Sequence, residues 1–256
     1  MQHDSELFAR QAAFGPIGLE GQQRLMESRA TICGCGALGS TIAQWLARAG
    51  VGFLRLVDDD KVATVNLHRQ ILFHPADVPD RRKVDAAAKQ LALYEGPTEV
   101  EPVFTRFDQS NAMSLCEDVD LIIDATDNFK TRYVINETAV RLGIPWIYGG
   151  AMGGRGQVMT ILPGRTPCLR CMLGEWSPQY DSDSCVVSGI LGPTAGTIAS
   201  IESVEALKVL SGNLDAVASR LMVLDLWNGR IQTVDAMPSA GGDPCVVCGY
   251  VGSNEA

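Results

Sequence analysis

The chain has 256 residues, of which 46% are hydrophobic and 20% charged, and its formal net charge is −9. This length and composition are typical of one large globular domain. The negative charge argues against nucleic acid as the main partner, because phosphate backbones are met by clustered Lys and Arg. The sequence has no apolar run of about 20 residues that could span a membrane. Charges in the opening MQHDSELFAR argue against a signal peptide, so we expect a cytoplasmic protein.

Helical and strand patterns alternate along the first 150 residues. A helical stretch over residues 6–30, broken at 14–16, precedes a strand at 30–33, a helix at 40–49 and a strand at 53–57. There follow a helix at 82–93, strands at 100–104 and 120–124, a helix at 131–142 and a strand at 145–148. This alternation predicts an α/β fold with a Rossmann-like, mostly parallel sheet and helices on both faces.

The pattern changes after residue 155. Strands are predicted at 157–162, 221–225 and 230–234, the last two joined by the hairpin-type turn Trp227-Asn228-Gly229. A long apolar helix is predicted at 193–210. With no linker-like tract, residues 1–256 are expected to form one domain. Within it we expect a nucleotide-binding part at 30–150 and an extension with a few antiparallel strands at 156–256.

The segment TICGCGALGS, residues 31–40, predicts a phosphate-binding turn. Gly34, Gly36 and Gly39 give the spacing GxGxxG between a strand and a helix, and Ala37 belongs to the same expected cofactor-binding loop. The missing Lys-Ser/Thr pair excludes a Walker-type loop. Asp58, about 20 residues further on at the end of the second strand, stands where an acid accepts hydrogen bonds from ribose hydroxyls. Both NAD and ATP fit these features.

A polar and cationic set downstream favours a triphosphate over NAD. It consists of Asn66, Arg69, Gln70 and Lys83, in which a guanidinium fork and a point charge suit phosphate oxygens. An NAD-dependent oxidoreductase remains the alternative, although it leaves these residues without a role.

The loop after the predicted strand at 120–124 is a candidate cation site. Open α/β sheets bind ligands at the carboxyl ends of their strands. Asp127, followed by Asn128, could hold Mg²⁺ against phosphate oxygens, whereas Asp124 is more typical of a structural carboxylate.

Eight cysteines in such a chain point to metal or thiol chemistry. Cys168 and Cys171 form one CxxC pair, and Cys245 and Cys248 form another. Two such pairs can complete a closed tetrahedral zinc site. This site would be structural and would link the end of the chain to its middle. Independent redox motifs or buried unpaired thiols are the alternatives.

The sequence resembles the ThiF/MoeB/HesA family, prokaryotic relatives of ubiquitin-activating enzymes, and looks closest to ThiF. The resemblance runs from about residue 8 to residue 249 and rests on GCGALG, DDDKVATVNLHRQILF, IIDATDN, CLRC, SCVVSGILGPTAG and CVVCG. It implies ATP- and Mg²⁺-dependent adenylation of the C-terminal glycine of a small ubiquitin-like sulfur-carrier protein. Residues 156–256 would then bind the carrier and zinc. A non-catalytic binder of a ubiquitin-like protein is a further alternative.

The resemblance also implies roles for individual residues. The glycine loop would pack against adenosine and phosphates, Asp58 would hold the ribose, and Asp127 would bind Mg²⁺. Asn66, Arg69 and Lys83 would contact phosphates. Arg10, in FARQ, matches an arginine that reaches the ATP of a neighbouring subunit, which implies a homodimer. Two positions depart from the family pattern: Ala37 replaces a frequent glycine, and Leu7 a frequent arginine.

Of the other cysteines, Cys33, Cys35 and Cys116 are expected to be packing residues, the last on a helix. Cys185, in the polar segment YDSDSC, matches a cysteine that can link covalently to the carrier or carry a persulfide. Its neighbours Asp181 and Asp183 would raise its thiol pKa, so a small structural residue is the competing interpretation. A sulfurtransferase or cysteine desulfurase is implied as a further partner.

Overall fold

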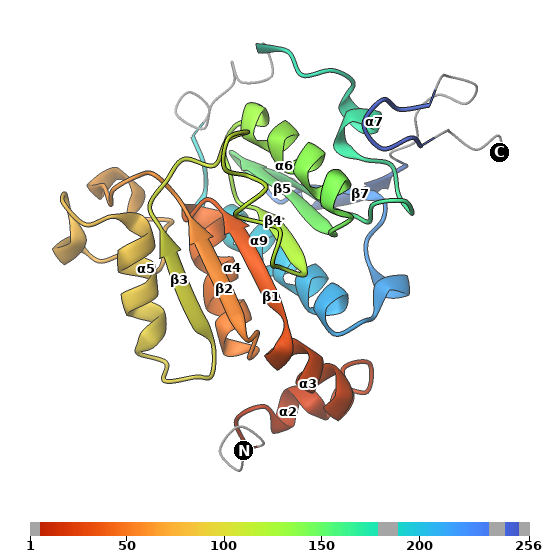
Figure 1. The fold of residues 1–256 in the computed structure, drawn as a ribbon. Coiled ribbons are helices and arrows are strands. Elements are labelled where there is room, and N and C mark those ends of the chain that lie inside the picture. Colours follow the sequence, from red (N-terminus) through yellow and green to blue (C-terminus); the bar gives the residue numbers. More distant parts are fainter. Residues whose placement is uncertain (1–5, 179–188, 236–243, 251–256) are drawn as a thin grey trace.

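The computed structural model describes residues 6–178, 189–235 and 244–250, and these form an α/β fold around one eight-stranded sheet. The strand order is β3-β2-β1-β4-β5-β6-β7-β8 (Figure 1). The first five strands in this order are parallel, and β6, β7 and β8 continue the sheet antiparallel. The bounds are β1 Arg29–Cys33, β2 Phe53–Val57, β3 Glu99–Val103, β4 Leu121–Asp124, β5 Trp146–Met152, β6 Arg155–Ile161, β7 Leu221–Asp225 and β8 Arg230–Val234.

Helices cover both faces of the sheet, as expected. One face carries α4 (Ala37–Arg48), α5 (Lys83–Ala92) and α9 (Gly192–Leu210), and α6 (Phe129–Leu142) and the short α7 (Leu169–Leu173) lie on the other (Figure 1). Among the described residues there are also α2 (Ala9–Ala12), α3 (Gly18–Glu27), η1 (Thr64–Asn66), η2 (Pro75–Asp77) and η4 (Leu214–Ala216). In the part of the chain that the structure describes, no helix is long and apolar enough to cross a membrane.

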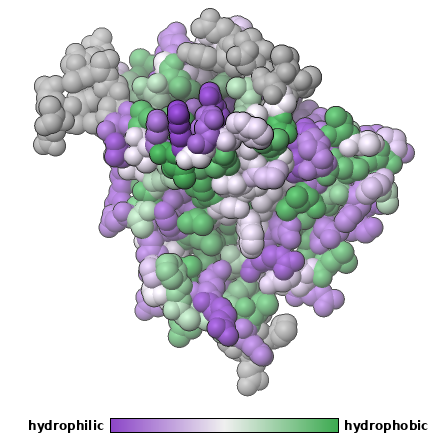
Figure 2. Space-filling view, turned by 180° about the vertical axis from the view of Figure 1, so that it is seen from behind, coloured by the Kyte–Doolittle hydropathy of each residue, from purple (hydrophilic) through white to green (hydrophobic). Residues whose placement is uncertain are grey.

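Helix α9 is apolar on most of its surface. Its buried residues face α4, β5 and β6, yet Val204 on its outer side is 52% exposed, as is Trp45 on α4. The view from behind shows apolar side chains exposed among polar ones on this side of the molecule (Figure 2). A helix that is hydrophobic all round is normally buried on all sides, so the exposed outer side of α9 is unusual.

Several elements differ from the expected bounds, most of them by one or two residues. Helix α4 begins at Ala37 and not at residue 40, because Gly36 takes the N-cap position directly after the glycine turn. Strand β5 continues through its glycines to Met152, because pairing with β6 over the full hairpin outweighs the low strand propensity of glycine. Cys116 lies in a series of turns and not in the expected helix.

The uncovered part of the second face, over β1 to β3, is closed by residues 104–120 and not by a helix. Strand alternation sends Ala30 and Ile32 toward the helices and Thr31 and Cys33 toward this segment. Thr31 Oγ1 donates to the Leu115 carbonyl at 2.7 Å.

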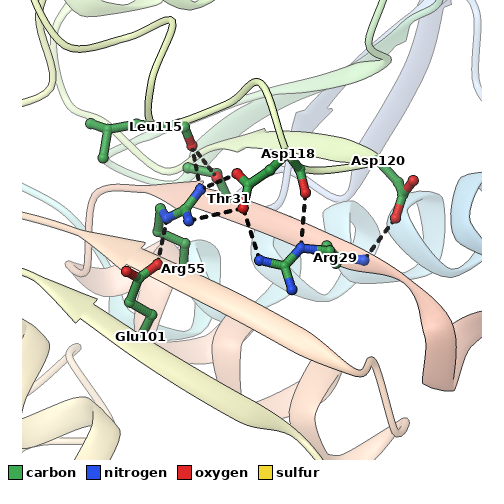
Figure 3. Close-up of polar contacts among 7 residues, drawn as sticks. All are labelled: Arg29, Thr31, Arg55, Glu101, Leu115, Asp118 and Asp120. Atoms are coloured by element: carbon green, nitrogen blue, oxygen red, sulfur yellow. Dashed lines mark hydrogen bonds and ion pairs between the residues drawn. The ribbon is translucent and has the colours of Figure 1, made fainter.

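A charged network secures this segment to the sheet (Figure 3). Arg55 on β2 donates to Glu101 Oε2 and Asp118 Oδ1, both at 2.6 Å, and to the Leu115 carbonyl at 3.1 Å. Arg29 bonds to the same Asp118 at 2.9 Å. Hydrogen bonds from Arg55, then from Arg29, lower the pKa of Asp118 to about 2, so it is ionised at neutral pH.

Candidate functional site

The glycine turn brings the backbone of the β1–α4 connection close to the β4 loop. Gly34 has φ +98°, and a Cβ there would lie 2.5 Å from the Ala125 carbonyl oxygen. A Cβ on Gly39 would lie 2.0 Å from the Gly34 carbonyl oxygen, so this glycine allows α4 to pack on the turn. The N-terminus of α4, at Gly36 and Ala37, consequently points its free N–H groups into the space above the sheet, an arrangement that binds phosphate.

Asp58 and Lys83 form the next side of the site. The Cys35 N–H donates to Asp58 Oδ2 at 2.7 Å, which connects the glycine turn to the end of β2. Burial raises the pKa of Asp58, and the charge of Lys83 opposes that rise. Lys83, itself buried, lies 2.7 Å from Asp60 Oδ2 and 4.0 Å from Asp58 Oδ1. The acid expected at the ribose and the lysine expected at the phosphates are therefore neighbours.

Arg69 lies beside the turn, held by residues of η1. Its Nη2 donates to Asn66 Oδ1 at 2.8 Å, and its Nη1 donates to the Val65 carbonyl at 3.1 Å. Gln70 is buried, and its Oε1 has no hydrogen-bond partner among the described residues. Its Nε2 would lie 3.6 Å from a Cβ on Gly36, so this amide reaches the glycine turn.

The loop after β4 carries the predicted cation ligand. Asp127 is exposed on this loop, and Asn128 caps α6 by accepting the Thr131 N–H at 2.9 Å. Asp124 is fully buried and pairs with Arg132 at 2.9 Å, as expected of a structural carboxylate. Burial raises the pKa of Asp124, and the charge of Arg132 opposes this effect.

These groups line one cavity of about 880 Å³ at the carboxyl ends of the strands. Its size falls in the range of about 300–1,000 Å³ that is usual for ligand pockets. The predicted residues in its wall are Gly34, Gly36, Ala37, Asp58, Arg69, Gln70, Lys83, Asp127 and Asn128. The wall also holds residues that the sequence reasoning missed, among them Arg106, Arg132, Tyr148, Arg155 and Gln157.

Three of the residues predicted at the nucleotide site lie outside this wall. Gly39 is engaged in packing α4 on the turn, and Asn66 orients Arg69 and does not itself face the cavity. Arg10 is exposed on α2, at the end of the sheet where the strands begin (Figure 1). There the ring of Phe8 packs against Gly50, just before β2, so α2 lies far from the cavity of its own chain. Cys185 lies outside the described residues.

The two CxxC pairs meet, as predicted. Their Sγ atoms all lie within 4.8 Å of one another, with Cys168 at 3.8 Å from both Cys171 and Cys245, and Cys171 at 3.5 Å from Cys248. Four sulfurs at about 2.3 Å from a tetrahedral zinc ion would be about 3.8 Å apart, so the geometry fits this metal. The Leu169 N–H, donating to Asn136 Oδ1 at 2.9 Å, ties the first pair to α6.

The other described cysteines are packing residues. Cys33, Cys35 and Cys116 are fully buried. Burial raises the thiol pKa of all three, that of Cys116 to about 12. Buried thiols with raised pKa values are poor nucleophiles, which supports the packing role expected for the two cysteines of the glycine turn.

The glycine turn, the acid after β2 and the cationic cavity at the strand ends define a nucleotide-binding protein of the doubly wound α/β class. Within that class the chain belongs to the ThiF family, whose model matches residues 8–245.

Named relatives agree with this assignment. The chain is 37% identical to the sulfur carrier protein ThiS adenylyltransferase of Bacillus subtilis, over 94% of this chain and 71% of the relative. It is 36% identical to the SAMP-activating enzyme E1 of Haloferax volcanii, over 96% and 89%. Among solved structures, that of PaaA superposes with a TM-score of 0.78 at 25% identity, covering 92% of this chain and 84% of the other.

Proposed function

We propose that the chain adenylates the C-terminal glycine of a small ubiquitin-like sulfur-carrier protein, with ATP as co-substrate. The observation that carries this proposal is the cavity that combines the glycine turn with Arg69, Lys83 and Asp127. A dinucleotide site would need the turn and Asp58 but not these three side chains. The names of the relatives, which act on sulfur carriers such as ThiS, support the same reaction.

In this reaction a carrier carboxylate oxygen attacks the α-phosphorus of ATP, and the bond to the departing pyrophosphate breaks. The products are an acyl-adenylate and pyrophosphate. Negative charge on the phosphate oxygens is met by Lys83, Arg69 and the N–H groups of α4. No general base is needed, because the carboxylate is already a nucleophile. Asp127 would hold Mg²⁺, which supplies further positive charge to the phosphates when bound.

The far end of the cavity suits a tail without side chains. Gly150, Ala151 and Gly156, which carry no side chain or only a methyl group, line the cavity beside the hydrogen-bonded pair Tyr148 and Gln157 at 3.1 Å. An extended Gly-Gly terminus could lie along this backbone and bring its carboxylate to the phosphates. We therefore place the carrier tail along β5 and β6, and its globular body outside the cavity.

Zinc at the four-cysteine cluster would be structural, because four thiolates leave no open coordination position. It would join α7 to residues 244–250 and so hold the carboxyl-terminal extension against α6. Thiolate ligands persist in a reducing compartment, which supports the cytoplasm as the site of action.

A homodimer would complete the site. Arg10 lies at the opposite end of its own sheet from the cavity, so it can contact ATP only in a neighbouring subunit. The exposed apolar side chains Val204 and Trp45, on helices that are largely buried, are candidates for the contact between the two copies. We propose that Arg10 reaches the phosphates of the partner's ATP.

Cys185 is proposed to take part in sulfur transfer after adenylation, with a sulfurtransferase or cysteine desulfurase as the sulfur source. Cys185→Ala is expected to leave pyrophosphate exchange intact and to block thiocarboxylate formation on the carrier. Unimpaired thiocarboxylate formation would refute the covalent role, and the small-residue interpretation would then hold.

The test of the proposed function is exchange between labelled pyrophosphate and ATP in the presence of a carrier ending in Gly-Gly. We expect carrier-dependent exchange, and its loss by at least about 100-fold in Asp127→Ala, since a phosphate-bound metal supplies several kcal/mol to the transition state. Asp215→Ala, at an exposed acid of η4, is the matched control and should retain full exchange. An NAD-linked absorbance change without exchange would favour the oxidoreductase, and neither signal would favour a non-catalytic binder.

A further inference from the structure

Arg132 is a buried cation of the cavity wall, and it bonds to three segments at once. Its Nε donates to Asp124 Oδ2 at 2.9 Å, and its Nη2 donates to the carbonyls of Thr126 at 2.9 Å and Gly149 at 3.1 Å. Its side chain is 8% exposed. The guanidinium also lies over the ring of Phe129, 4.7 Å from the centroid.

These bonds bridge a gap in the sheet. Strands β4 and β5 pair through Ile122 and Ile123 with Trp146 and Ile147, and this ladder ends there. Beyond it, Arg132 links the end of β4 to the backbone of β5. The two carbonyls that it holds belong to the residues directly before Asp127 and Gly150.

The back of the same strand is closed by Glu202 of α9. A Cβ on Gly149 would lie 2.1 Å from Glu202 Oε1, so the bare glycine leaves room for this carboxyl group. Glu202 is fully buried, and neither carboxyl oxygen has a hydrogen-bond partner among the described residues. The strand at Gly149 is thus held between a guanidinium on one face and a carboxyl group on the other.

We propose that Arg132 is a positioning residue for adenylation, which fixes the Asp127 loop against the glycine edge of β5. It would set the distance between a cation held by Asp127 and the acceptor carboxylate lying along Gly150. This inference rests on the proposed function of the same cavity. It assigns to Arg132 an effect on cation affinity that a residue with only a folding role would not have.

The test is a measurement of the equilibrium binding of Mn²⁺, a paramagnetic substitute for Mg²⁺. The electron paramagnetic resonance signal of the free ion reports how much Mn²⁺ is unbound. The full chain is used with an ATP analogue that has a methylene bridge between its α and β phosphates. Arg132→Lys keeps the charge but cannot make all three bonds. We expect its Mn²⁺ dissociation constant to rise about tenfold, as for other residues that orient metal ligands.

A second variant covers the case in which Arg132→Lys fails to fold. Thr126→Val removes the 2.6 Å hydrogen bond from Thr126 Oγ1 to Asp124 and leaves the buried ion pair intact. It should weaken Mn²⁺ binding several-fold. Arg55→Lys is the matched control, because Arg55 is also buried and paired with acids but lies outside the cavity wall; it should bind Mn²⁺ as the parent chain does.

The outcomes separate this inference from the proposed function. Unchanged Mn²⁺ affinity in Thr126→Val and in folded Arg132→Lys would overturn the positioning role while leaving adenylation standing. Equal weakening in Arg55→Lys would also overturn it, because the effect would then be general destabilisation. Failure of the parent chain to exchange pyrophosphate would instead refute the proposed function.

Discussion

Two buried arginines, Arg55 on β2 and Arg132 on α6, have opposite surroundings. Arg55 pairs with Asp118 and Glu101, whose side chains are 45% and 44% exposed (Figure 3). Arg132 pairs with Asp124, which is fully buried, and across the strand lies a second buried acid, Glu202, with no hydrogen-bond partner in the described part of the chain. The first network can exchange its contacts for water, whereas the second cannot. The chain therefore keeps its least replaceable charges beside the cavity, where they orient the site.

The largest expected effect is that of removing the charge beside the cavity. Arg132→Met leaves Asp124 buried and unpaired, so the free energy of unfolding should fall by about 3–5 kcal/mol. Urea denaturation followed by circular dichroism would measure this. A loss below about 1 kcal/mol would mean that Asp124 finds another partner or is already protonated.

Arg55→Met should lower the free energy of unfolding by less than Arg132→Met does. Arg55→Met removes the partner of two half-exposed acids, which regain water, so we expect a loss of about 1–3 kcal/mol. It should leave pyrophosphate exchange unchanged in rate per folded molecule. Equal losses in Arg55→Met and Arg132→Met, from paired urea titrations, would remove the distinction between the two networks.

Glu202 should affect how the stability of the chain depends on pH. Burial, then the negative charge of Asp124, raises the pKa of Glu202 well above its usual value. The unfolded chain releases this proton at lower pH than the folded chain, so Glu202 costs stability as pH rises above the unfolded pKa.

Glu202→Gln removes this ionisation while conserving shape. Its stability relative to the parent chain should therefore increase from pH 5 upward, by up to about 1.4 kcal/mol per pH unit until the folded pKa is reached. Thermal or urea unfolding of both chains from pH 5 to pH 8 would measure the difference. A constant difference across this range would contradict a protonated Glu202 in the folded state.

The sequence predicted the parts of the site that depend on local patterns. The turn at Gly34 and Gly36, the acid Asp58 and the paired cysteines have fixed spacings, and the fold placed each where the spacing implied. The sequence could not show at which end of the sheet Arg10 lies, because the packing of α2 decides this.

Tertiary contacts decided the rest. Arg132 follows Asp124 by a turn and the start of α6, and no periodic pattern marks that it bonds to Gly149 on another strand. Glu202 lies in an apolar helix, and only the glycine opposite it shows that it faces β5. Acidic residues within apolar helices, opposite glycine-rich strands, are the one signal that could have indicated this pair.

The most direct test of the central claim is mass spectrometry of the carrier protein after incubation with this chain, ATP and Mg²⁺. The account predicts that a carrier ending in Gly-Gly gains the mass of an adenylyl group, and that a carrier lacking its last two residues does not. Hydroxylamine should release the group, because an acyl-adenylate is a mixed anhydride. A carrier that keeps its original mass, with ATP unconsumed, would contradict the account.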